Sequence, residues 1–330
     1  MKSVNVTPRF WVAFGLVLFV LIVGLIGPLI VRTSPDAVIG GLYDPPHGFG
    51  AFMLGTDNEG QSVIANLVYG TRTSLIVGLL AGLVASSIGL IIGIVAGYRG
   101  GVVDDILSGF TNVALAIPGI VVVILLSIAL DSRSIVTLAV VIGITSWPWM
   151  ARAVRAQASS VRTREHLDVA KLSGANFLSI LLWDVLPYLL SYVAMAFVLQ
   201  VSGAILTESA LSMLGLGPSG TVSLGIMLYW SLAWGSIRTG AWWAFIPPTV
   251  MLTLIAFSLL LLQSSLDEVF NPRLRRGKAA KRKKGPGPQK PAADEPEPLP
   301  SDLQLVSAGP QGGGAPVVET PVSAPSGDLR

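Results

Sequence analysis

The sequence predicts an all-α, polytopic membrane protein with six transmembrane helices, and three observations predict this fold class. The chain has 330 residues, of which 52% are hydrophobic and only 12% are charged, whereas soluble domains carry about 25% charged residues. Its mean hydropathy is +0.69. Six apolar runs are long enough to cross a bilayer core of about 30 Å as helices. They comprise residues 10–31, 74–98, 112–130, 134–151, 186–206 and 242–264.

The first run contains no charged residue, and we expect it to stay in the protein as a transmembrane helix. Residues 32–73 follow as a polar interval rich in Gly, Pro and Asp. Near the end of this interval, apolar residues recur at helical spacing between positions 63 and 68. This spacing predicts a short amphipathic helix that Asp57 can cap.

The distribution of Lys and Arg predicts the orientation. If residues 1–9 lie in the cytoplasm, the inner segments hold 18 of the 22 Lys and Arg, as the positive-inside rule requires. Both termini are then cytoplasmic, residues 32–73 form an extracytoplasmic loop, and residues 74–267 form one transmembrane domain. Residues 268–330 begin with a basic patch suited to anionic lipid and continue as a Pro- and Gly-rich stretch that we expect to be disordered.

Several kinds of chemistry are excluded by what the chain lacks. It has no cysteine and only two histidines, so disulfides, thiolate chemistry and Cys-based metal sites are ruled out. It also has no Gly-x-x-x-x-Gly-Lys-Ser/Thr stretch, so it cannot hold a nucleotide triphosphate in that kind of loop. We therefore expect this chain to bind no cofactor or metal and to have no catalytic residues.

The polar loop between the fourth and fifth runs, residues 152–185, is the segment most informative about function. Thr163 can cap a helix with Glu165 in its first turn and Lys171 in its last, in agreement with the helix dipole. Gly174 stands where a left-handed residue ends a helix. A second helix, capped by Asn176, would then lead to the fifth run. Such a loop is either a docking element or a plain connection.

The same loop resembles the cytoplasmic coupling loop, or EAA loop, of importer-type ABC permeases. That motif reads Glu-Ala-Ala, three residues, Gly, and a spacer that ends at Leu-Pro. This chain has Asp168-Val169-Ala170, then Gly174, then Leu186-Pro187. Asp replaces Glu and Val replaces the middle Ala, while the register is kept.

Further segments are similar to the dipeptide/oligopeptide-type permeases, and the resemblance as a whole extends over residues 10–275. The chain departs from that family's usual Gly-Arg-Asp at Gly60-Gln61-Ser62, and it lacks the usual Gly-Asp pair and Arg after the sixth run. The similar segments are Leu54-Gly55-Thr56-Asp57 with Tyr69-Gly70-Thr71-Arg72-Thr73-Ser74-Leu75, Gly97-Tyr98-Arg99-Gly100-Gly101 with Asp104-Asp105, Ala116-Ile117-Pro118-Gly119, and Leu206-Thr207-Glu208-Ser209-Ala210-Leu211-Ser212-Met213-Leu214-Gly215-Leu216-Gly217.

The resemblance implies a type I ABC importer permease fold and a subunit of a larger assembly at the plasma membrane. Its partners would be a second homologous permease, two ABC ATPase subunits or one fused ATPase, and an extracellular solute-binding protein. ATP and Mg would be bound by the ATPase partners. The cargo would be di- or oligopeptides, or alternatively oligosaccharides or metal complexes.

Polar residues in and after the fifth run leave two interpretations open. Gln200, with Tyr192 and Ser202 nearby, could line a translocation path, but an interhelical hydrogen bond from Gln200 is the simpler account. Glu208 could contact a binding protein, or it could cap the turn that follows it. Pro118 could be a gating hinge or a static kink.

Two other functions compete with the permease subunit. A stand-alone secondary transporter would need ionisable residues inside the membrane, and the interiors of the six predicted runs contain none. A membrane scaffold would depend on its tail to recruit partners. Deletion of residues 277–330 would separate these ideas, because a scaffold would lose its role and a transporter would keep most of its activity.

Overall fold

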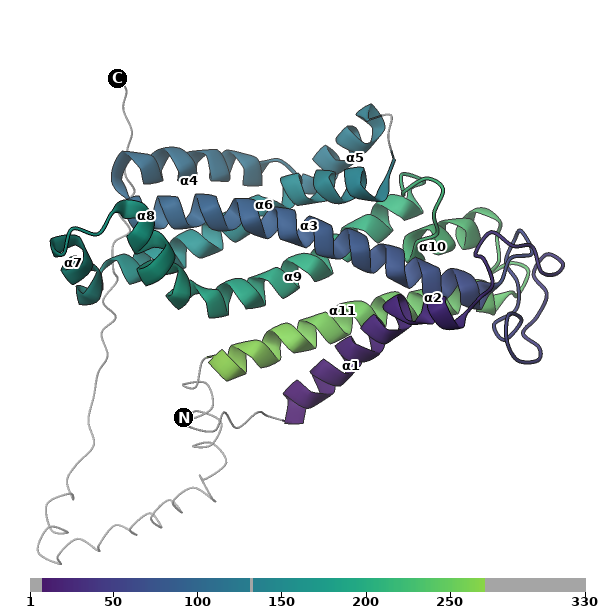
Figure 1. Ribbon diagram of the computed structural model, residues 1–330. Helices are drawn as coiled ribbons and strands as arrows, with labels where there is room; N and C mark the ends of the chain where they lie inside the picture. Colours follow the sequence, from purple (N-terminus) through teal and green to yellow (C-terminus); the bar gives the residue numbers. More distant parts are fainter. Residues whose placement is uncertain (1–7, 131–132, 271–330) are drawn as a thin grey trace, which may run out of the picture. The chain divides into compact units, whose positions relative to one another are not determined.

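Long apolar helices make up the fold in the computed structural model, which describes residues 8–130 and 133–270 (Figure 1). Five helices have the length and composition to cross a membrane, and a bent pair supplies a sixth candidate span. The predicted helical, multi-span fold class is thereby confirmed. The helical elements are α1 Pro8–Leu25, α2 Gly27–Ile30, α3 Val63–Arg99, α4 Gly101–Ala116, α5 Gly119–Ala129, α6 Ile135–Arg162, α7 Glu165–Leu172, α8 Phe177–Ser179, the π-helix η1 Ile180–Val185, α9 Leu186–Met213, α10 Leu224–Ala233 and α11 Trp242–Phe270.

Helix α3 packs closely on α6 and α9 because small residues line its contact faces. A side-chain carbon at Gly93 would lie 2.6 Å from the carbonyl oxygen of Ala151, and one at Gly97 would lie 2.5 Å from that of Arg155. Small residues allow such close approach of helix backbones, which stabilises helix pairs in lipid, where apolar character alone drives no association.

The amphipathic stretch predicted before the second run is not a separate helix, because it forms the first turns of the 37-residue helix α3. Ser62, and not Asp57, caps this helix, since its Oγ accepts a hydrogen bond from the amide of Ala65. Asp57 instead accepts hydrogen bonds from the amides of Glu59 and Gln61, both at 2.9 Å. The capping residue is therefore the one directly before the first helical turn, and not the earlier aspartate that the sequence suggested.

The third apolar run differs most from expectation, because two helices bent by 79° replace the single span. Pro118 lacks an amide donor and restricts the residue before it, and Ile117 is accordingly extended with ψ 127°. Most of the loop expected at residues 99–109 is helical, and Gly100, with φ 66°, separates α3 from α4.

The loop and the fifth run are joined by continuous helix from Phe177 to Met213, and Leu186-Pro187, expected at the junction of the two, begins α9 within it. The amide of Leu186 donates to the carbonyl of Leu181, five residues back, as in a π-helix. Pro187 explains this widening, because an α-helical turn would press its ring against the carbonyl four residues before it. The predicted tail and its basic patch, together with residues 131–132, lie outside the described residues.

Candidate functional site

Helix α7 is a short surface helix at the end of the bundle opposite the segment 32–62 (Figure 1). Two of its apolar side chains are open to solvent, since Val169 is 62% exposed and Leu172 is 88% exposed. Leu167, by contrast, is fully buried. The helix thus presents apolar surface outward while one side chain attaches it to the protein.

The charges of α7 follow the order expected from the sequence. Glu165 and Asp168 lie in its first turn and Lys171 in its last, so the side chains complement the helix dipole. The Lys171 Nζ lies 2.9 Å from Asp168 Oδ1. Because both groups are exposed, this pair contributes little stability, and the Asp168 carboxylate remains accessible to a partner.

The end of α7 matches the prediction made for Gly174, which has φ 78°. Its amide donates to the carbonyl of Lys171 at 3.0 Å, and the amide of Ala175 donates to the carbonyl of Ala170 at 3.2 Å. These two bonds form a Schellman motif, which requires a left-handed residue and favours glycine. Ala170 and Gly174 are therefore held on one rigid turn.

The caps predicted for the loop are not formed by side chains. Arg164, and not Thr163, is the residue that precedes α7, and the Thr163 hydroxyl donates backward to the carbonyl of Ser160. Asn176 does precede α8, but its side chain makes no capping bond. Helix α7 therefore begins one residue later than the sequence pattern predicted.

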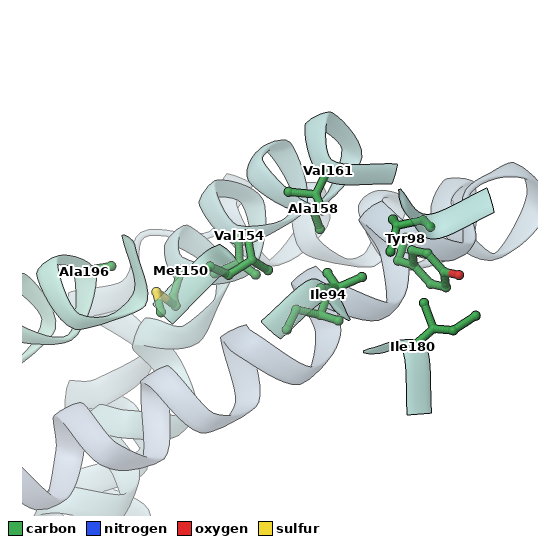
Figure 2. Packing of buried hydrophobic residues seen from close by; sticks show 11 residues of the cluster. Ile94, Tyr98, Met150, Val154, Ala158, Val161, Ile180 and Ala196 are labelled. Carbon is green, nitrogen blue, oxygen red and sulfur yellow. The ribbon is translucent and has the colours of Figure 1, made fainter. Parts of the chain in front are cut away.

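A buried apolar cluster lies beneath α7 and joins the loop to α3, α6 and α9 (Figure 2). Ile94 and Tyr98 of α3 and Ile180 of η1 face one another in it, with Val154, Ala158 and Val161 of α6 alongside. Leu167 belongs to the same cluster, and Ala170, Leu186 and Tyr192 pack against it. The predicted loop residues thus divide into those on α7 and those at the η1–α9 junction.

The residues predicted for a translocation path lie in different surroundings. Gln200 Nε2 donates to the carbonyl of Ser146 in α6 at 3.0 Å, which is the interhelical hydrogen bond that the sequence left open. Ser202 is buried, and Tyr192 is half-buried. These three residues of α9 stay candidates for lining the path.

Glu208 has a role that the sequence reasoning did not find. It is fully buried inside α9, so it does not cap a following turn. The hydroxyl of Ser74 in α3 donates to Glu208 Oε2 at 2.9 Å, and that of Ser212 donates to Oε1 at 2.7 Å. Because Ser74 lies 134 residues away, no local pattern could have indicated this contact.

A second missed contact ties α4 to α6. Asp104 binds the Arg155 guanidinium through both carboxylate oxygens, with an Nη2–Oδ2 distance of 2.7 Å. The guanidinium of Arg152 donates to Asn112 Oδ1 at 2.8 Å. Bidentate pairs of this kind fix geometry as well as charge. Two of the basic residues counted in the polar loop, Arg152 and Arg155, therefore lie on α6 and bind side chains of α4.

Polar side chains of the segment 32–62 find partners within the protein. His47 Nδ1 lies 2.8 Å from the carbonyl oxygen of Pro45, and its ring packs against Phe52. Asp57 Oδ2 accepts a hydrogen bond from Asn66 at 2.9 Å, and burial raises the pKa of the Asp57 carboxyl. Thr56 is fully buried beside them.

A bundle of apolar helices long enough to span a membrane defines a class, the multi-pass helical membrane proteins. Comparison with known families makes this specific. Residues 89–276 match the family described as "Binding-protein-dependent transport system inner membrane component", and the chain belongs to this family. It is therefore a multi-pass permease subunit of a binding-protein-dependent ABC importer, with ATP hydrolysis assigned to a separate subunit.

Curated relatives resemble this chain over most of its length. The dipeptide transport system permease protein DppC of Bacillus subtilis is 34% identical over 79% of this chain and 81% of its own. DppC of Haemophilus influenzae is 30% identical, and the match covers 78% of this chain and 88% of the relative. The oligopeptide transport system permease protein OppC of Bacillus subtilis is 29% identical, and the match covers 68% of this chain and 72% of the relative. Among solved structures, a chain of the MetNI methionine ABC transporter is 18% identical, with a TM-score of 0.49, and covers 64% of this chain and 95% of its own.

Proposed function

We propose that this chain translocates di- or oligopeptides that an extracellular binding protein delivers, and that ATPase subunits on the cytoplasmic side drive the transport. The relatives named for dipeptide and oligopeptide transport support the cargo class. ATP and Mg are bound by the ATPase subunits, two separate chains or one fused chain. A second, homologous permease subunit completes the path.

The observation that carries the coupling role is the exposed apolar face of α7. Val169 and Leu172 are largely open to solvent on a helix whose only buried side chain, among those described, is Leu167. Apolar side chains of this size gain about 1.5–3 kcal/mol when fully buried, so a groove on an ATPase would favour them. Asp168 adds an accessible carboxylate beside them.

The other residues of the motif support this role from the protein side. Ala170 and Gly174 shape the turn that presents α7, while Leu186 and Pro187 start the helix that carries movement toward the membrane interior. Gln200, Tyr192 and Ser202 follow on the same helix and are our candidates for the translocation path. With α7 in the cytoplasm, both termini lie there too, and the segment 32–62 faces the binding protein.

Serine substitution of the exposed face tests this assignment. In the assembled complex, Val169→Ser with Leu172→Ser removes two apolar side chains from the docking surface, and we expect at least about a tenfold weaker retention of the ATPase. Co-purification measures it. Val102→Ser is the matched control, because Val102 is 73% exposed on α4, outside the loop. Unchanged retention in the double variant would remove α7 from the interface.

The cargo class needs a separate measurement. Thermal-shift binding of the purified binding protein to panels of peptides, oligosaccharides and metal complexes distinguishes the alternatives, because binding only to the native state raises the unfolding temperature. We expect peptides to produce the shift. A shift with sugars or metal complexes alone would contradict the peptide assignment while leaving the ABC importer role in place.

A further inference from the structure

Ring contacts attach the chain directly before α7, at Arg164, and beyond its end, at Phe177. The Arg164 guanidinium carbon lies 4.9 Å from the centre of the Tyr188 ring, which belongs to α9. On the other side, the Phe177 ring lies 5.6 Å from the ring of Tyr98, and the Arg99 guanidinium lies 5.4 Å from its centre. Tyr98 and Arg99 are the last two residues of α3. The loop is therefore attached to α9 where it enters α7 and to α3 where it leaves.

Helix α7 has a third attachment between these two. Leu167 is buried in the cluster that contains Tyr98 and Ile180. With only Leu167 fully buried and the small Ala170 packed beside it, the cluster fixes the position of α7 more firmly than its direction. The rings of Tyr188 and Phe177 supply the two points that fix the direction. Together, the three contacts define the position of α7 on the ends of α3 and α9.

The far ends of the same two helices are also joined. Ser74 of α3 donates to the fully buried carboxylate of Glu208 in α9, and Ser212 donates to its second oxygen. A buried carboxylate that loses its donors is costly, so α3 and α9 resist sliding past each other at this point. Helix α3 is 37 residues long, or about 55 Å at 1.5 Å per residue. The pair therefore connects α7 with the opposite end of the bundle.

We propose that Phe177 and Tyr188 are positioning residues for energy coupling, because their ring contacts lock α7 to α3 and α9 so that all three helices move as one lever. This proposal rests on the proposed function, since an ATPase must push α7. Without the rings, α7 would pivot about Leu167, and a push would be absorbed by the loop.

Paired spin labels test the lever directly, and because this chain has no cysteine of its own, only the introduced pair is labelled within it. Labels at Glu165→Cys in α7 and Ile91→Cys in α3 report the distance between the two helices in the full complex, with and without ATP and vanadate. We expect a narrow distance distribution that ATP leaves unchanged. In Phe177→Ala with Tyr188→Ala, it broadens by about twofold or more, because an aromatic pair and cation–π contacts are lost.

Matched variants separate positioning from general damage. Phe110→Ala breaks another aromatic pair, with Trp147 at 5.5 Å, outside the loop, and should leave the distribution narrow. The conservative pair Phe177→Tyr with Tyr188→Phe should restore it. An unchanged width in the double alanine variant, or an ATP-dependent distance in the unsubstituted protein, would overturn the lever. Co-purification of the ATPase with the Val169→Ser and Leu172→Ser variant tests docking, whereas the label distances test the lever. The two proposals can therefore fail independently.

Discussion

Two segments join long helices at opposite ends of the bundle (Figure 1), and the bonds that hold them differ in kind. In the segment 32–62, the Thr56 hydroxyl donates to the Gly41 carbonyl and accepts from the Asp44 amide, both at 2.7 Å. Trp243 Nε1 of α11 donates to the Thr56 carbonyl at 3.0 Å. The loop that contains α7 instead depends on Leu167 and on ring contacts. Directional polar bonds fix the first segment, whereas apolar and aromatic packing fixes the second.

The largest expected effect is on the side of α7. Leu167→Ala leaves a cavity in the buried cluster and should cost about 2–5 kcal/mol, which loosens α7 before it disturbs the long helices. Hydrogen exchange of residues 164–176, followed by mass spectrometry, measures this. In the subunit purified without the ATPase, Leu172→Ala, at an 88% exposed position, should leave the exchange unchanged. Equal exchange in both variants would contradict the attachment through Leu167.

The corresponding substitution in the segment 32–62 is Thr56→Val. It removes both bonds of a buried hydroxyl, and we expect a loss of about 1–3 kcal/mol, seen as a lower thermal unfolding temperature in detergent. Thr163→Val removes an exposed hydroxyl that makes one bond and should have an effect within about 0.5 kcal/mol. If the two variants unfold alike, the polar bonds of Thr56 do not distinguish the segments.

A smaller effect is expected at the turn after α7. Gly174→Ala places a side chain at φ 78° and should cost about 1–2 kcal/mol through backbone strain, although nothing lies within 4 Å of the new carbon. Weaker retention of the ATPase in co-purification would report it. Gly203→Ala meets equally open space within α9 and should be neutral or stabilising. Weaker retention of the ATPase in Gly203→Ala but not in Gly174→Ala would contradict the strain argument.

The smallest effect is a pH dependence in the segment 32–62. Burial raises the pKa of Asp57 above its ordinary value of 3.8, so folding favours the protonated carboxyl. Its contribution to stability is complete below pH 3.8 and is lost as the pH rises through the raised pKa. The unfolding temperature, measured from below pH 3.8 upward, should fall as this contribution is lost. Asp57→Asn should remove this part of the pH dependence. Asp36→Asn, an exposed position, should keep the pH dependence.

Local chemistry made parts of this structure readable from sequence. Apolar run lengths indicated the spans, and the conformation of Gly174 followed from its place after a short helix. Proline was a poorer guide. Pro118 ends α4, whereas Pro148, Pro247 and Pro248 lie inside continuous helices. Pro118 is followed by glycine, and α5 beyond it is largely exposed, so little packing holds the two helices in line.

The contacts that carry the proposals lie outside the reach of local patterns. Ser74 and Glu208 are 134 residues apart, and Phe177 meets Tyr98 across the whole of α4, α5, α6 and α7. Hydrophobic periodicity indicates that a helix has a buried face, but it does not indicate which other helix covers that face. The roles of Thr163 and Asp57 were misassigned for a related reason, because several neighbouring residues could cap the same helix and only the folded backbone selects one.

The π-helix η1 has a consequence for insertions and deletions in this chain. Each residue of an α-helix turns the following ones by about 100°, so a wide turn of i to i−5 bonds sets the phase of everything beyond it. Loss of one residue between 180 and 185 would let ordinary helix form there. Because the wide turn takes up one extra residue in about the same rotation, this loss would leave Glu208 on its present side of α9. Loss of one residue from the ordinary helix between 187 and 207 would instead swing Glu208 about 100° around the axis, away from Ser74. Single-residue deletions should therefore be tolerated better within η1 than after it.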